Sequence, residues 1–186
     1  MIISNRVRAV IWMLILFVSV YAGFLLDAIL GFRLDPILSR IAGAALLAVI
    51  LRAAAVTGRY LSVYGHEPGA PRGSITKLVR AGPYACMRHP MHFFLSMTPI
   101  AIGLMLASPS AVLTGIVAAI LVLVLAVKVD EAESLERFGE EYERYRREVP
   151  AFNLHPRCLL LALYPMPRRR RETSLRPMDE NQVEES

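Results

Sequence analysis

Four nearly uncharged apolar runs constrain the fold more than any other feature of this sequence. A helix that crosses the hydrocarbon core of a bilayer needs about 20 mostly apolar residues, and each run comes close to that length. Such runs are too long for the interior of an ordinary soluble domain of 186 residues. The sequence therefore predicts an all-α integral membrane protein with four transmembrane helices, at residues 10–30, 37–56, 91–107 and 111–129.

The third and fourth runs are separated only by the uncharged turn Ser108-Pro109-Ser110. Two helices joined by so short a turn form an antiparallel hairpin. The end of the fourth run, at Val129, then returns to the membrane level of His89. We therefore expect residues 128–131 to lie on the same membrane face as the stretch 78–92.

Charge predicts the orientation in the membrane. The loop 52–88 and the C-terminal segment are rich in arginine, whereas the turn after the third run carries no charge. Basic loops stay preferentially in the cytoplasm. Both termini and the site are therefore expected on the cytoplasmic side, although Arg33 and Arg40 beside the first loop argue weakly in the other direction.

The segments after the fourth run divide the rest of the chain. Residues 130–149 are charged and amphipathic, with apolar side chains at spacings of three and four, and predict interfacial helices with a turn at Gly139. The fifth hydrophobic segment, 159–164, is too short to span a bilayer. We predict four units: an N-terminal two-helix membrane hairpin (1–57), a core with a cytoplasmic loop, the helical hairpin and the amphipathic helix (58–150), an interfacial segment with the basic run 168–171 (151–171), and a disordered tail (172–186).

The stretch 78–92 places turn residues, an aromatic ring and ionisable side chains directly before an apolar run. Gly82-Pro83 predicts a turn, and Pro90 suits the first turn of the following helix. The polar side chains are then held together at a membrane surface, which favours a functional site over a simple connector in which Arg88 binds lipid phosphates. The side chains concerned are Tyr84, Arg88, His89 and His92.

The two cysteines and the net charge indicate which kinds of ligand the protein can bind. Cys86 and Cys158 lie in segments expected in the reducing cytoplasm, and neither has the spacing of a metal ligand, so we expect no disulfide and no metal. The net charge of +5 comes mostly from arginine and suits anionic lipid headgroups. No motif for binding nucleic acid accompanies it.

An ordered set of short motifs resembles the isoprenylcysteine carboxyl methyltransferase family and its phospholipid methyltransferase relatives. Arg88-His89-Pro90 precedes the hairpin; Asp130-Glu131, the segment Phe138 to Tyr142 and Val149-Pro150 follow it. The resemblance covers residues 76–149. It implies a multispanning enzyme that transfers a methyl group from S-adenosylmethionine to a lipophilic acceptor.

When the family's functional positions are transferred to the matching positions of this sequence, the resemblance implies roles for individual residues. Expected catalytic residues are Arg88, His89, His92 and Glu131. The cofactor site would comprise Thr76, Lys77, Leu78, Val79, Tyr84, His89, Pro90, Met91, His92 and Asp130. Backbone amides and His89 suit the cofactor carboxylate, Asp130 or Glu131 its ammonium, and the apolar side chains its adenine ring.

This sequence departs from the family pattern at three positions, and the third concerns the acceptor. His92 stands where the family usually has a tyrosine, and Asp130 where it usually has a glutamate. Ala126 stands where the family has the arginine that recognises a carboxylate. Lys128 is then the nearest cation and the expected substrate-binding residue. The nearest family assignment is protein-S-isoprenylcysteine carboxyl O-methyltransferase. The alternatives are N- or S-methylation of a phospholipid or small molecule, in which His89 or His92 could act as the base, or a non-catalytic protein that binds anionic lipid.

Overall fold

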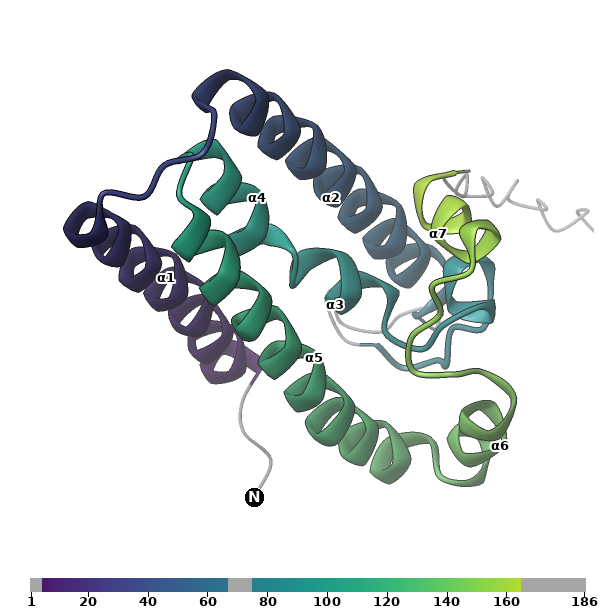
Figure 1. Cartoon of the computed structure of the whole chain (residues 1–186). Helices are drawn as coiled ribbons and strands as arrows, with labels where there is room; N and C mark the ends of the chain where they lie inside the picture. The colour runs from purple at the N-terminus through teal and green to yellow at the C-terminus, as the bar shows by residue number, and fades with distance from the viewer. Residues whose placement is uncertain (1–4, 67–74, 165–186) are drawn as a thin grey trace, which may run out of the picture.

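The computed structural model describes residues 5–66 and 75–164, and these residues form helices joined by short connections. The predicted basic run 168–171 and the tail 172–186 lie outside the described residues. The elements are α1 (Asn5–Leu30), α2 (Pro36–Tyr64), the 3₁₀ helix η1 (Gly82–Ala85), α3 (Pro90–Leu95), α4 (Thr98–Met105), α5 (Pro109–Phe138), α6 (Glu140–Glu148) and α7 (Pro156–Leu163). Helices α3, α4 and α5 lie between α1 and α2 (Figure 1).

Within the described residues, three helices rather than four are long and apolar enough to cross a membrane: α1 from Val10, α2 and α5. The predicted third span, 91–107, is divided into α3 and α4. Pro99 has no N–H to donate to the Leu95 carbonyl, and the Thr98 hydroxyl donates to that carbonyl instead, at 2.7 Å. The helix therefore ends at Leu95 and restarts at Thr98, directly before this proline.

The predicted antiparallel hairpin is formed by α4 and α5, which lie side by side (Figure 1). Close approach depends on Gly103, where an added Cβ would lie 2.7 Å from the backbone nitrogen of Val112. The N-cap of α5 is Ser108, whose hydroxyl accepts a hydrogen bond from the Ala111 amide.

Two predicted boundaries are wrong. Helix α5 does not end near Val129 but continues to Phe138, through the first part of the amphipathic segment, and is 30 residues long in all. That segment contains strong helix formers, and its first helix breaker is Gly139. Gly139 has a φ of 53° and separates α5 from α6, as predicted. Likewise, residues 58–64 belong to α2 rather than to the predicted loop, and the helix ends only at Gly65.

Helix α1 is tied to α5 by polar contacts as well as by apolar packing. The Thr114 hydroxyl donates to the Ser19 carbonyl at 2.8 Å. The Asp27 side chain is buried and accepts hydrogen bonds from the Ser108 hydroxyl and, at 3.0 Å, from the Ser110 amide. Asp27 therefore satisfies one of the first amides of α5 and fixes the register between the two helices.

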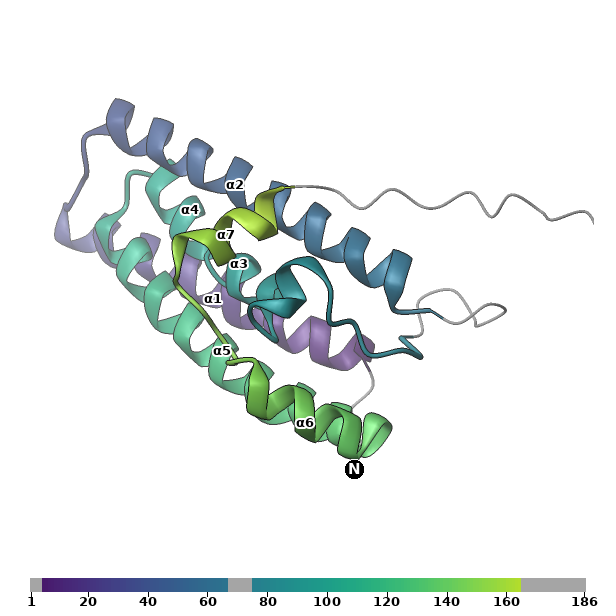
Figure 2. The same ribbon diagram turned by 90° about the vertical axis from the view of Figure 1, so that its right-hand side faces the viewer.

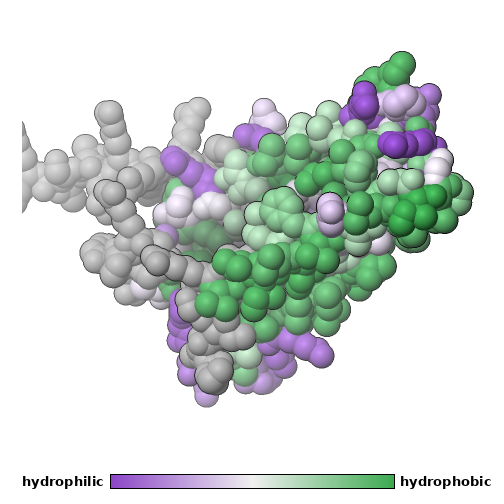
Figure 3. All heavy atoms as spheres, turned by 90° about the vertical axis from the view of Figure 1, so that its left-hand side faces the viewer, coloured by the Kyte–Doolittle hydropathy of each residue, from purple (hydrophilic) through white to green (hydrophobic). Residues whose placement is uncertain are grey.

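Outward-facing apolar side chains cover much of the helical surface. Figure 3 shows them as a continuous region with hydrophilic residues towards its margins. Val18, Ile29 and Val117 are each more than 60% exposed. A surface of this kind is covered by lipid chains in an integral membrane protein.

The C-terminal segment folds back along one side of the molecule, where α7 packs against α2 and η1 (Figures 1 and 2). The Arg52 side chain donates to the Leu163 carbonyl at 3.1 Å. The expectation that the cysteines are unpaired is wrong, because Cys86 and Cys158 form a disulfide with a Cα–Cα distance of 5.6 Å. The two cysteines are 72 residues apart in the sequence, so only the packing of α7 brings them together.

Candidate functional site

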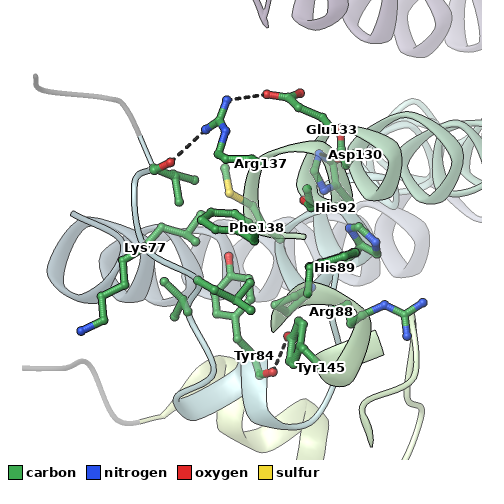
Figure 4. Close-up of a pocket in the computed structure, with 18 of the residues that line it drawn as sticks. Lys77, Tyr84, Arg88, His89, His92, Asp130, Glu133, Arg137, Phe138 and Tyr145 are labelled. Carbon is green, nitrogen blue, oxygen red and sulfur yellow. Dashed lines mark hydrogen bonds and ion pairs between the residues drawn. The ribbon is translucent and has the colours of Figure 1, made fainter. Parts of the chain in front are cut away.

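A cavity of about 630 Å³ lies at the end of the molecule where α1 begins and α2 ends. Ile75 and residues 77–79 form one wall, η1 and the start of α3 form the floor, and the end of α5 with α6 forms the opposite wall (Figure 4). This volume is in the range of pockets that hold small organic molecules.

Nearly all of the predicted cofactor residues meet at this cavity. Of that set only Thr76, an exposed residue, does not line it. Arg88 also contributes to the wall, whereas Glu131 and Lys128 do not, and Lys128 is exposed on α5. The predicted residues in the wall are Lys77, Leu78, Val79, Tyr84, Arg88, His89, Pro90, Met91, His92 and Asp130.

Glu131 is buried and holds the two basic residues that precede α3. Its Oε1 accepts from Arg88 at 3.0 Å (Nε) and 2.5 Å (Nη2), and lies 3.3 Å from His89 Nε2. The remaining Arg88 nitrogen, Nη1, donates to the backbone carbonyls of Arg146 and Val149. The guanidinium of Arg88 is therefore committed to the protein, which leaves it little capacity to bind a ligand anion.

The backbone beside these residues is fixed by the segment that follows α6. The amide of Arg88 donates to the Pro150 carbonyl at 3.0 Å, and the amide of His89 donates to the Ala151 carbonyl at 3.2 Å. This pairing explains why a Val-Pro pair far along the chain accompanies the Arg-His-Pro motif: the two segments lie next to each other.

The two histidines differ in their surroundings. His89 is buried, and desolvation lowers its pKa more than the neighbouring Glu131 carboxylate raises it. His92 is half-buried, with its Nε2 3.4 Å from Asp130 Oδ2 and its ring 4.4 Å from the Trp12 ring, edge to face. His89 is therefore held by Glu131, and His92 lies between α1 and α5.

Tyrosines form the inner part of the cavity. Burial raises the pKa of the Tyr84 phenol far above its ordinary value and raises the pKa of Tyr142 to about 12, so both are neutral at physiological pH. The Tyr145 hydroxyl donates to the Tyr84 carbonyl at 2.6 Å and ties α6 to η1 (Figure 4).

Nine further residues line the cavity that the sequence did not predict, and four of them carry a signal that could have revealed them. Residues at three, four, seven and eight positions after Asp130 share its helix face, because α5 continues past that residue. Trp12 has no comparable signal, since nothing in the sequence relates α1 to the site. The lining residues missed are Trp12, Leu61, Ile75, Glu133, Ser134, Arg137, Phe138, Tyr142 and Tyr145.

The guanidinium of Arg137 is also engaged by the protein. It donates to the Ile75 carbonyl at 2.9 Å and to Glu133 at 2.8 Å, and so closes the cavity wall between α5 and the loop at 75–79 (Figure 4). The ammonium of Lys77 points away from the other labelled side chains in Figure 4. None of the three cations in the wall is therefore placed as an evident partner for a ligand carboxylate.

Comparison with known proteins adds one match. The family model described as phospholipid methyltransferase matches residues 37–141, which is more than half of the chain. The matched range runs from α2 to the beginning of α6 and contains most of the cavity wall, but not Trp12, Tyr142 or Tyr145. No curated protein and no solved structure matches the chain.

Proposed function

Because this chain belongs to the phospholipid methyltransferase family, and is thus a membrane methyltransferase, we propose that it transfers a methyl group from S-adenosylmethionine to a lipophilic acceptor at the 630 Å³ cavity. One observation carries the proposal. The residues to which sequence resemblance assigned the cofactor lie in four separate stretches of the chain, and all but Thr76 line a single cavity.

The chemistry of the wall suits the parts of the cofactor. Leu78, Val79 and Tyr84 offer an apolar slot for the adenine ring. Asp130 can pair with the ammonium group, and the backbone amides in the first turn of α3 can bind the carboxylate. Aromatic faces in the wall suit the positively charged sulfonium.

Glu131 and Arg88 act as positioning residues in this proposal rather than as groups that touch the reactants. Their buried ion pair holds the start of α3, and through it His89 and His92, against α5. Arg88 borders the cavity, but its N–H groups donate hydrogen bonds to Glu131 and to two backbone carbonyls.

The reaction itself needs positioning more than activation. The acceptor's lone pair forms a bond to the methyl carbon as the carbon–sulfur bond breaks, and the electron pair of that bond stays on sulfur to give a thioether. Holding the two reactants in line supplies much of the rate enhancement. An amine acceptor must also lose a proton, and His92 or His89 can accept it.

The acceptor favoured by this geometry is a lipid amine rather than a prenylcysteine carboxylate. A carboxylate would need a cation, yet Ala126 is fully buried, Lys128 is exposed away from the cavity, and both arginines of the wall are engaged elsewhere. An amine needs a proton acceptor instead, and His92, whose Nε2 lies 3.4 Å from Asp130 Oδ2, can supply it. The family to which the chain belongs agrees with this class of acceptor.

The test uses the full chain in vesicles with methyl-labelled S-adenosylmethionine. Vesicles with phosphatidylethanolamine should incorporate label into lipid, and a farnesylcysteine analogue should be methylated poorly. Asp130→Asn should reduce cofactor affinity about 10- to 100-fold, as expected for the loss of a charge-assisted contact, while Glu141→Gln on the exposed face of α6 should not.

Two results would contradict the proposal at different levels. If the purified protein does not bind S-adenosylmethionine, the cofactor site is wrong. If it binds the cofactor but methylates the farnesylcysteine analogue efficiently, and Lys128→Ala abolishes that activity, the predicted role of Lys128 holds and the amine assignment fails.

A further inference from the structure

Three metal-ligating side chains meet at one side of the cavity, although they come from two different helices. His89 and His92 lie at the start of α3, and Asp130 lies on α5 (Figure 4). Each offers one donor atom, and these atoms all lie within 4.8 Å of one another. His89 is buried, and the other two side chains are half-buried.

The spacing of the donors is close to that of a coordination sphere. A zinc-like ion with bonds of about 2.0–2.1 Å places neighbouring tetrahedral ligands roughly 3.3–3.5 Å apart. His92 Nε2 and Asp130 Oδ2 are already separated by 3.4 Å. The longest separation in the group, at most 4.8 Å, would need a movement of only about 1 Å.

The surroundings of His89 suit a metal ligand. Metal-bound histidines commonly donate the second ring N–H to a carboxylate, which fixes the tautomer and the orientation of the ring. His89 Nε2 lies 3.3 Å from Glu131 Oε1, and Glu131 is itself held by Arg88. When Nε2–H donates to Glu131, the lone pair of the ring is on Nδ1.

We propose that His89, His92 and Asp130 bind one divalent first-row transition-metal ion, with its remaining coordination positions open to the cavity. Two imidazoles and one carboxylate are a ligand set that suits Zn²⁺, Co²⁺ and Ni²⁺ rather than Mg²⁺ or Ca²⁺. This site goes beyond the methyl-transfer function. It also contradicts the expectation of no metal that the cysteine spacing alone had suggested.

The site has a regulatory consequence that rests on the proposed function. The same three side chains are assigned to S-adenosylmethionine, so the ion and the cofactor cannot both occupy them. The metal ion is therefore an inhibitor that excludes the cofactor.

The sole tryptophan of the chain provides a direct readout of metal binding. The Trp12 ring lies 4.4 Å from the His92 ring, so a Co²⁺ ion bound to His92 should quench its fluorescence. The full chain in detergent, without cofactor, is titrated with Co²⁺. We expect saturable quenching that a chelator reverses, and Zn²⁺ should displace Co²⁺ and restore the emission.

Matched variants test the assignment of the ligands. His92→Ala and Asp130→Asn should each raise the Co²⁺ concentration for half-quenching at least tenfold, whereas His66→Ala, just after the end of α2, should leave it unchanged. Asp130→Asn is nearly isosteric, so it keeps the test valid if His92→Ala folds poorly. Absence of saturable quenching, or the same midpoint in the wild type and both ligand variants, would overturn the proposal.

A second measurement separates metal binding from the methyltransferase function. Equilibrium binding of labelled S-adenosylmethionine should weaken as Zn²⁺ is added. If the cofactor binds and Zn²⁺ leaves its affinity unchanged, mutual exclusion is wrong. If Co²⁺ quenches Trp12 while the cofactor does not bind at all, the metal site stands and the proposed function fails.

Discussion

Glu131 shows how a residue outside the cavity can organise its wall. Its carboxylate is buried, and one of its oxygens lies within hydrogen-bonding distance of both Arg88 and His89. A buried charge pair is costly to separate, because the group that remains is left charged and desolvated. Through this pair, α5 fixes the chain segment at the start of α3.

The variant Glu131→Gln should therefore be strongly destabilising. The amide keeps an acceptor oxygen but removes the negative charge, and we expect a loss of about 3 kcal/mol in the free energy of unfolding. Glu133→Gln is the matched control, because its pair with Arg137 is partly exposed and should be worth less than about 1 kcal/mol. Unfolding in mixed detergent micelles would measure both, and equal losses would contradict the positioning role of Glu131.

The hydroxyl of Tyr145 makes a second, weaker connection in the site. Tyr145→Phe removes its hydrogen bond to the Tyr84 carbonyl, which lies in a buried region. The net loss should be about 0.5–1.5 kcal/mol in unfolding free energy, with weaker S-adenosylmethionine binding. Tyr64→Phe, at an exposed position, is the control and should change neither quantity.

Among the helices, α5 connects the membrane interior with the site. Its first half packs against α1 and α4, and its last turns carry Asp130, Glu133 and Arg137 into the cavity wall. At a rise of 1.5 Å per residue, Asp130 lies about 30 Å along the helix from Ser108. Because the helix is continuous, a change in packing near Ser108 displaces the residues at the site as well.

A pair of glycine substitutions tests the close packing of α4 on α5. An added Cβ at Gly103 would lie 2.7 Å from the Val112 backbone nitrogen and 2.8 Å from the Ala111 carbonyl carbon, so Gly103→Ala must separate the two helices. We expect a loss of about 1–3 kcal/mol in unfolding free energy. In α2, Gly58 has nothing within 4 Å of such a Cβ, so Gly58→Ala should be neutral or stabilising by up to about 1 kcal/mol. Similar effects at both positions would argue against this helix contact.

The arrangement of the ends of the helices predicts how the protein lies in the membrane. The start of α1, the end of α2 and the last part of α5 all meet at the cavity, whereas the α1–α2 connection and the α4–α5 turn lie at the other end (Figures 1 and 2). Together with the arginine-rich loop, this predicts a cytoplasmic cavity with both termini on the same side.

Cysteine-accessibility labelling can check this orientation in a Cys86→Ser/Cys158→Ser background. A cysteine at Arg33, between α1 and α2, and a cysteine at the exposed Glu141 on α6 should react from opposite sides of the membrane. Only the second should be reached by an impermeant reagent added to the cytoplasmic face. Labelling of both positions from one side would contradict the arrangement.

Length, hydrophobicity and local motifs determined much of this protein without reference to a structure. The membrane class follows from the apolar runs, because few other structures can accommodate them. Gly139 predicted a helix boundary because glycine disfavours helix interiors, and its φ of 53° with a ψ of −128° is a conformation that glycine adopts more easily than other residues. The short turn at Ser108 to Ser110 predicted the hairpin, and the hairpin predicted that Asp130 would lie near His89 and His92.

Other features depended on packing between segments that are distant in the sequence. The Cys86–Cys158 bond requires α7 to fold back onto η1, and the contact of Trp12 with His92 requires α1 to pack on α5 in one register. The Leu95 carbonyl and Thr98 hydroxyl end α3 through local contacts, but hydropathy alone could not distinguish a broken helix from a bent one. Local sequence patterns indicate the backbone conformation of each segment and whether it prefers lipid or water. The partner of a buried side chain, in contrast, is determined only when whole helices pack together.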